Sequence, residues 1–223
     1  NATLISVHGR SELKTNKFSK KFNIKAILSL EKFLSSKEID AVYVATPHNT
    51  HFLYSMEAIQ SKKHVLCEKP LSVNSVEAMI LVNEARKNEV FLMEAFMYRV
   101  HPQTKNLLKL LQENFSGEEI KIQSSFGFKA DVNQQHRLRN PDLAGGAILD
   151  VGCYPLSMSR LIAGAMENKN FLDPLQMEVS SILDETGIDL NATAKIVFSK
   201  KIEAEIKTAI NEELTNDLVI MSK

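Results

Sequence analysis

The run Ala41-Val42-Tyr43-Val44-Ala45 is short and continuously apolar. A run of this kind is typical of a β-strand that is buried on both faces of a parallel sheet. A second apolar strand is predicted at His64–Cys67 and a third at Val90–Glu94. Between these two strands, Asn74 and Glu77 have the spacing of a capping box at the start of a helix. Strands that alternate with helices of this length predict a parallel, doubly wound sheet.

The residues on the N-terminal side of this run continue the alternation. Strands are predicted there at 3–8 and 24–28, and helices at 11–22 and 29–37. The first domain is therefore expected to span residues 1–97 and to contain the parallel sheet.

The pattern changes in the second half of the chain. An amphipathic helix is predicted at 101–114 and a strand at 120–128, and strand patterns return from Gln176 onward. Residues 202–207 alternate between apolar and charged side chains, which gives a period of two with one polar face. We expect residues 98–223 to form an α+β domain with a mainly antiparallel, open sheet.

The composition is that of an ordinary globular protein. Of 223 residues, 44% are apolar and 24% are charged, and the formal net charge is zero. A neutral chain has no electrostatic preference for nucleic acid or for a membrane surface. No apolar run approaches the roughly 20 residues that span a bilayer. The two cysteines, Cys67 and Cys153, have no zinc-binding spacing, so we expect no metal, reduced thiols and a cytoplasmic location.

The tripeptide Glu68-Lys69-Pro70 follows the predicted strand at His64–Cys67 directly. Ligands of open parallel sheets bind beyond the carboxyl ends of the strands, so Lys69 is placed to face a reaction centre. The alternative is a surface lysine that precedes a turn-forming proline.

The segment GGAILDVGCYP at 145–155 places a carboxylate and a phenol four residues apart. On a helix, Asp150 and Tyr154 project from one face, and together with a lysine they can move a proton on and off an alcohol oxygen. The two glycines permit close backbone approach or a positive φ, and Pro155 predicts a kink or a new first turn. The alternative is ordinary helix chemistry, with Asp150 favoured by the helix dipole and Tyr154 partly buried.

Two loops are expected to lie where they could contact a cofactor. Four candidates lie in the segment that follows the central apolar strand: Thr46, Pro47, Asn49 and His51. A generic cap and turn is the alternative for that segment. Arg10 and Ser11 follow the first strand, where an acidic residue would hold the ribose of NAD and an arginine accommodates the 2′-phosphate of NADP. This predicts NADP(H) over NAD(H), and a solvated helix N-terminus is the alternative.

Two arginines are further candidates for contacts with a small-molecule substrate. Arg99 stands at the expected junction between the domains, where a structural role is the alternative. Arg137 lies in the polar loop at 131–140 and is expected to bind substrate or to anchor the loop.

These motifs together resemble the glucose–fructose oxidoreductase/inositol dehydrogenase (Gfo/Idh/MocA) family. The resemblance runs in order over nearly the whole chain. It rests on four segments, Val42–Pro47 with His51, Val65–Pro70, Met93–Arg99 with His101-Pro102, and Gly145–Pro155. The last segment is similar to the dihydrodiol dehydrogenase and glucose–fructose oxidoreductase branch, because inositol dehydrogenases typically carry histidine where this chain has Tyr154.

The resemblance implies a Rossmann domain followed by an α/β domain whose open sheet mediates homo-oligomers. It also implies an NAD(P)-dependent oxidoreductase that transfers hydride between nicotinamide and a CH–OH group of a sugar or cyclic diol. The resemblance implies that Lys69 is catalytic and that its peptide bond to Pro70 is cis. It also implies that Tyr154 is the acid/base and that Asp150 orients the substrate or Lys69. Glu68 and Lys69 are implied to contact the cofactor.

The chain departs from the family at both ends. It has no Gly-rich dinucleotide fingerprint, and roughly 30 residues, about one strand–turn–helix unit, are expected to be missing before its first strand. In the strand order 3-2-1-4-5-6 the missing strand is central, so the first two strands here are expected not to pair with the other three. The segment at 217–221 reads as the start of another strand, so the second domain is also expected to be partial.

The missing unit would supply the backbone N–H cradle for the pyrophosphate, so the chain as it stands is expected to bind cofactor weakly or not at all. Two alternatives to an enzyme stay open. One is a non-catalytic dinucleotide-binding regulator of the same fold, and the other is an inactive fragment.

Overall fold

The computed structural model describes residues 2–222, and its internal contacts divide the chain into two compact units. The first unit contains the residues up to Thr46 together with Thr50–Glu94. The second contains Pro47–Asn49 and the residues from Ala95 onward. The short segment Pro47–Asn49 therefore belongs, by its contacts, to the unit that follows it in the chain.

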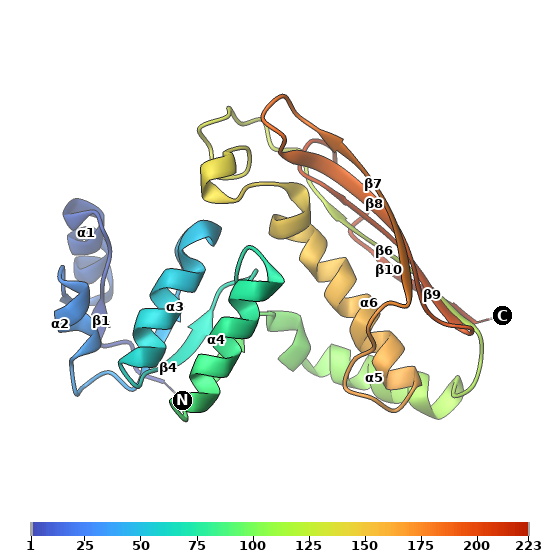
Figure 1. Ribbon diagram of the computed structural model, residues 1–223, viewed down its shortest axis with the longest axis horizontal. Helices are drawn as coiled ribbons and strands as arrows, with labels where there is room; N and C mark the ends of the chain where they lie inside the picture. The colour runs from blue at the N-terminus through green and yellow to red at the C-terminus, as the bar shows by residue number, and fades with distance from the viewer. Residues whose placement is uncertain (1, 223) are drawn as a thin grey trace. The chain divides into compact units, whose positions relative to one another are not determined.

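The first unit contains two separate parallel sheets (Figure 1). β1 (Ser6–Val7) pairs with β2 (Lys25–Ala26), and β3 (Ala41–Val44) pairs with β4 (His64–Cys67), which pairs with β5 (Leu92–Glu94). The prediction that the first two strands would not pair with the other three is thus confirmed. Four helices connect the strands: α1 (Glu12–Phe22), α2 (Leu30–Leu34), α3 (His51–Gln60) and α4 (Ser75–Lys87).

Two helices of this unit, α1 and α4, begin at the capping side chains that the sequence offers. Ser11 accepts a hydrogen bond from the Lys14 N–H at the start of α1, and Asn74 accepts one from the Glu77 N–H at the start of α4. Side-chain acceptors of this kind satisfy N–H groups that have no partner within a helix. The predicted start of α4 is therefore confirmed.

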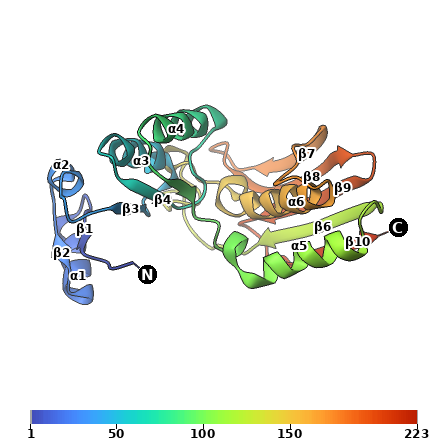
Figure 2. The ribbon, with the colours of Figure 1, turned by 90° about the horizontal axis from the view of Figure 1, so that it is seen from below.

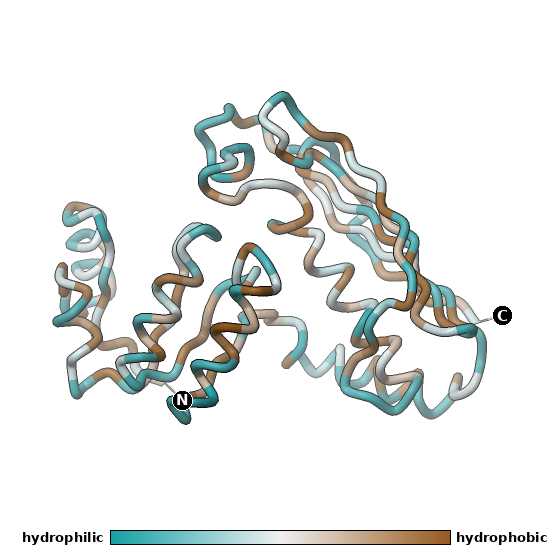
Figure 3. Tube along the Cα trace, in the orientation of Figure 1, coloured by the Kyte–Doolittle hydropathy of each residue, from teal (hydrophilic) through white to brown (hydrophobic). Residues whose placement is uncertain are grey.

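The three-stranded sheet is covered by α3 and α4 on one face (Figure 1). Apolar residues lie along β4 and along both helices (Figure 3). Val44, Val65 and Cys67 point to that face and are buried. On the other face Tyr43 is 57% exposed and Leu66 is 38% exposed. The prediction that the strand at 41–45 is buried on both faces was wrong, because the helices of this unit that the structure describes cover only one of them.

The second unit is a five-stranded sheet with two long helices on one face (Figure 2). The helices are α5 (Pro102–Asn114) and α6 (Cys153–Met166). The strand order is β10-β6-β9-β8-β7, with only β6 and β9 parallel, as expected for a mainly antiparallel sheet. The strands are β6 (Ile120–Gly127), β7 (Gln176–Leu183), β8 (Asp189–Ser199), β9 (Ile202–Ala209) and β10 (Leu218–Ser222).

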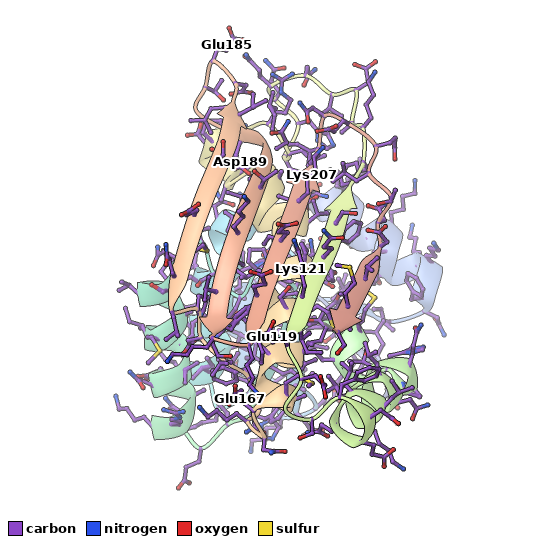
Figure 4. The ribbon with its side chains drawn as sticks, turned by 90° about the vertical axis from the view of Figure 1, so that its right-hand side faces the viewer. Glu119, Lys121, Glu167, Glu185, Asp189 and Lys207 are labelled. Carbon is purple, nitrogen blue, oxygen red and sulfur yellow. The ribbon has the colours of Figure 1, made fainter. Side chains whose placement is uncertain are left out.

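The two faces of this sheet differ in character. Ile122, Ile196 and Phe198 point toward the helices and pack against Ile162 of α6. The opposite face carries polar and charged side chains, among them the labelled Lys121 and Lys207 (Figure 4). The predicted period of two in β9 is thereby confirmed. Of the helices among residues 2–222, none combines the length and the apolar character that a membrane crossing requires.

Candidate functional site

In the first unit, four of the predicted cofactor residues follow the carboxyl ends of β3 and β4, namely Thr46, His51, Glu68 and Lys69. His51 is fully buried, and its ring nitrogens lie 2.7 Å from the Thr46 carbonyl oxygen and 2.7 Å from that of Pro70. The imidazole therefore ties the loop after β3 to the loop after β4. The Lys69–Pro70 peptide bond in the second loop is cis, as expected.

Neighbouring contacts fix the same two loops. The Thr50 hydroxyl donates to the Thr46 Oγ1 at 2.9 Å, and the Leu71 N–H donates to the Glu94 Oε1 at 2.7 Å. Glu68 accepts a hydrogen bond from the Tyr43 hydroxyl. The residues on either side of Lys69 are thus held by contacts with β3 and β5.

Arg10 and Ser11 follow β1, as predicted, but they are used differently. The Ser11 side chain is the N-cap of α1, so its oxygen accepts from the Lys14 N–H at 3.4 Å. Arg10 is exposed. Of these two candidates, it is therefore Arg10 whose side chain is accessible to a phosphate group.

In the second unit, a buried carboxylate has two basic neighbours. The side chain of Asp150 is 6% exposed, and its Oδ1 accepts a hydrogen bond from the Arg137 Nη1 at 2.9 Å. The His48 Nε2 lies 3.8 Å from the same oxygen, and the His48 Nδ1 lies 3.0 Å from the Ala144 carbonyl oxygen. A buried carboxylate is stable only when it is paired and hydrogen-bonded. Arg137 therefore pairs with the Asp150 carboxylate, and Arg137 and His48 together fix its direction.

Tyr154 lies in a group of aromatic rings. Its ring centroid is 5.3 Å from those of Phe96 and Phe126 and 6.1 Å from that of Tyr98. Edge-to-face contacts at this spacing favour one orientation of each ring. A cavity of about 230 Å³ lies beside these rings, and its lining includes Tyr154, Tyr98, Phe126, Met158, Ser124 and Asp217. The Tyr154 ring is thus packed against aromatic side chains at the edge of a cavity whose lining is partly polar.

The helix that carries both side chains has an unusual start. A π-helical turn, η4 (Ile148–Gly152), holds Asp150, and α6 begins directly after it at Cys153. Pro155 is the third residue of α6, close to the point where the π-helical turn passes directly into the α-helix, so the predicted irregularity lies at this junction. The π-turn was not predicted, because it depends on contacts that are distant in the chain.

The two glycines before this turn are required by their surroundings. A Cβ added to Gly145 would lie 2.6 Å from the Leu138 carbonyl oxygen, and one added to Gly146 would overlap the Asp189 carboxylate. Gly146 also has a φ of +113°, which favours glycine. The glycines therefore bring the polar loop at 131–140 and β8 close to the start of the helix.

The remaining candidates have other partners. The Arg99 guanidinium donates to the Ser157 hydroxyl on α6 at 2.9 Å, and the Asn49 Nδ2 donates to the Asp142 carbonyl oxygen at 2.7 Å. Pro47 is on the same short segment as Asn49 and stays a candidate by position. Two residues were missed: His48, inside a segment already singled out, and Asp189, for which the sequence gives no local signal.

Comparisons with known proteins agree with this fold. The family described as "Oxidoreductase family, NAD-binding Rossmann fold" matches residues 1–96. Trans-1,2-dihydrobenzene-1,2-diol dehydrogenase of Xenopus tropicalis is 30% identical over 218 residues, which are 97% of this chain and 64% of that protein. D-xylose 1-dehydrogenase (NADP(+)) 2 of Haloferax volcanii is 38% identical over 136 residues, which are 61% of this chain and 42% of that protein.

A solved structure shows the same architecture over nearly all of the chain. A 3-ketoreductase from Actinomadura kijaniata, in complex with NADP and TDP-benzene, aligns with a TM-score of 0.83 at 24% identity. The alignment covers 99% of this chain and 68% of that one.

A parallel Rossmann-type unit followed by a mixed, mostly antiparallel sheet defines the class of fold. The chain is similar to members of the Gfo/Idh/MocA oxidoreductase family, whose model matches residues 1–96. It spans 64% of the length of the dihydrodiol dehydrogenase from Xenopus tropicalis.

Proposed function

We propose that the complete protein is an NADP(H)-dependent oxidoreductase that acts on a CH–OH group of a sugar or cyclic diol. The observation that carries this proposal is the buried Asp150, fixed by Arg137 and His48, one helical turn before a Tyr154 that aromatic rings hold in place. Relatives named as diol and xylose dehydrogenases support the same substrate class.

Each residue has a distinct role in the proposed reaction. The nicotinamide, when bound, accepts or supplies the hydride. The Tyr154 oxygen takes the proton of the substrate hydroxyl during oxidation and returns it during reduction. The Lys69 ammonium stabilises the phenolate form of the tyrosine. Asp150 orients the substrate, and Arg137, whose side chain is 49% exposed, donates to a second substrate oxygen.

The residues of the first unit fit part of a dinucleotide. The carboxyl ends of β3 and β4 place Thr46, Glu68 and Lys69 at one edge of a parallel sheet, where ligands of this fold bind. The exposed Arg10 beside β1 fits a 2′-phosphate and supports NADP(H) over NAD(H). The sequence contains no Gly-rich turn, so the pyrophosphate cradle is not supplied by these residues.

The first experiment is a fluorescence titration of NADPH and of NADH with this chain and with the full-length protein. Tight, NADPH-selective binding by the full-length protein supports the cofactor assignment. Binding that is weak for this chain and tight for the longer one supports the expected need for the Gly-rich turn. Equal affinity for NADH would contradict the role of Arg10.

The second experiment replaces Tyr154 with phenylalanine in the full-length protein and measures turnover of D-xylose and of a dihydrodiol. We expect kcat to fall by at least about 10²-fold while the NADPH affinity is unchanged, because the proton acceptor is lost. Tyr54→Phe removes a phenol from α3 and is the matched control. Cofactor binding without any turnover in the unmodified protein would favour the non-catalytic regulator instead.

A further inference from the structure

Asp189 contacts the start of the helix that carries the reacting groups. It is the first residue of β8, close to the hairpin that contains Glu185 (Figure 4). Its Oδ2 accepts a hydrogen bond from the Ile148 backbone N–H at 2.6 Å. Its Oδ1 lies against Gly146, where any side chain would overlap it. A residue 41 positions away in the sequence therefore caps this helix.

Two opposing effects act on the Asp189 carboxylate. The first N–H groups of a helix have no partner within it, and a negative charge there complements the helix dipole. Burial raises the pKa of Asp189, and the hydrogen bond from the Ile148 N–H acts in the opposite direction. The Thr208 hydroxyl of β9 donates to the Ala147 carbonyl oxygen at 3.3 Å, so two strands secure the same segment.

We propose that Asp189 is a positioning residue for Tyr154, acting through the N-terminus of the helical segment Ile148–Met166. Tyr154 follows Ile148 by less than two helical turns. Releasing the Ile148 N–H would loosen the π-turn that holds Asp150 and, with it, the first turn of α6 that holds Tyr154. The catalytic part of this inference rests on the proposed function, whereas the structural part does not.

The test compares Asp189→Ala, Asp189→Asn and Asp189→Glu in the full-length protein. Turnover of D-xylose and of a dihydrodiol is measured with NADP⁺, together with the NADPH affinity. We expect Asp189→Ala to lower kcat by about 10²-fold, since a small displacement of a reacting group has an effect of that size. KM and NADPH affinity should stay within about twofold. Asp189→Asn keeps a side-chain oxygen acceptor and should recover most of kcat.

Hydrogen exchange of the backbone amides at 147–154 is the second readout, because it does not depend on activity. We expect faster exchange there in Asp189→Ala but not in β9. Asp173→Ala is the control, since Asp173 pairs with Arg160 later on the same helix. That control should leave kcat and the exchange at 147–154 unchanged.

Several outcomes separate this inference from the proposed function. If the unmodified protein oxidises neither alcohol while exchange at 147–154 still accelerates in Asp189→Ala, the anchoring stands and the proposed function fails. If the protein is active and Asp189→Ala retains kcat within about twofold, the positioning role is refuted. If Asp189→Ala does not fold, Asp189→Glu, which displaces the carboxylate, is the deciding variant. An unchanged kcat in Asp189→Glu refutes the positioning role, and a fall in kcat of at least about tenfold supports it.

Discussion

Asp184 is expected to make a large, pH-dependent contribution to the stability of the second unit. Its side chain is only 4% exposed and accepts hydrogen bonds from the Thr186 hydroxyl at 2.6 Å and the Thr186 N–H at 2.8 Å. The Arg139 Nη2 donates to the other oxygen at 3.0 Å. These donors hold the pKa of Asp184 at about 2, below its ordinary value of 3.8. The contact anchors the loop that carries Arg137 to the β7–β8 hairpin.

The size and sign of the effect follow from this pKa. One pKa unit corresponds to about 1.4 kcal/mol, so the charged form contributes about 2 kcal/mol at neutral pH. Because the pKa is lower in the folded state than in the unfolded state, the folded state binds fewer protons between pH 2 and 4. The contribution is therefore fully present above about pH 4 and is lost as the pH falls toward about 2.

The assay is urea unfolding of Asp184→Asn and of the unmodified protein, followed by hydrogen exchange of β8, which belongs to the second unit. We expect the variant to be about 2 kcal/mol less stable at pH 7 and the difference to shrink steadily below pH 4. Asp173→Asn is the control, since Asp173 also pairs with an arginine but is 75% exposed and should contribute less than about 1 kcal/mol. A difference for Asp184→Asn that is the same at every pH would refute the reasoning.

Three further predictions test the packing. Phe198→Ala should lower the free energy of unfolding of the second unit by about 3–5 kcal/mol, because the ring is 1% exposed; a loss below about 1 kcal/mol in urea would contradict this. Gly146→Ala should destabilise that unit by at least about 1 kcal/mol, as its φ is +113°, and an unchanged urea midpoint would be inconsistent with that backbone. Cys153 should react with iodoacetamide before Cys67 in mass spectra of the native protein at pH 8, since burial raises the pKa of Cys67 to about 11; equal rates would exclude that environment.

The fold could be predicted from local patterns wherever the buried side chains of an element recur at one regular spacing. The alternation in β9, the cap at Asn74 and the separation of the first two strands from the other three all follow from neighbours in the sequence or from strand order. The failure concerned the strand at 41–45. Its apolar run indicates two covered faces, but the helices described in the first unit cover one, so Tyr43 is exposed. An apolar run indicates that a strand is suited to burial on both faces. Which helices cover those faces depends on the elements that are present, and the run itself does not contain that information.

The candidate site could be predicted less completely. Lys69, Asp150 and Tyr154 could be predicted as candidates because their residue types are those that proton transfer needs. His48 and Asp189 were missed because a histidine or an aspartate in a loop has many ordinary roles. Their relevance depends on distances across the fold, to Asp150 and to the Ile148 N–H, that no local pattern contains.

The way the second unit holds Asp150 explains why its site depends on distant residues. Arg137 approaches from a loop that Asp184 anchors, and His48 approaches from a segment about a hundred residues earlier in the chain. The turn itself is capped by Asp189 from β8. Each contact fixes a carboxylate or a backbone N–H that would otherwise be unsatisfied in a buried position. A change in any of the three segments should therefore act on the same side chain, so double-mutant cycles between Arg137 and Asp189 should show coupling through Asp150.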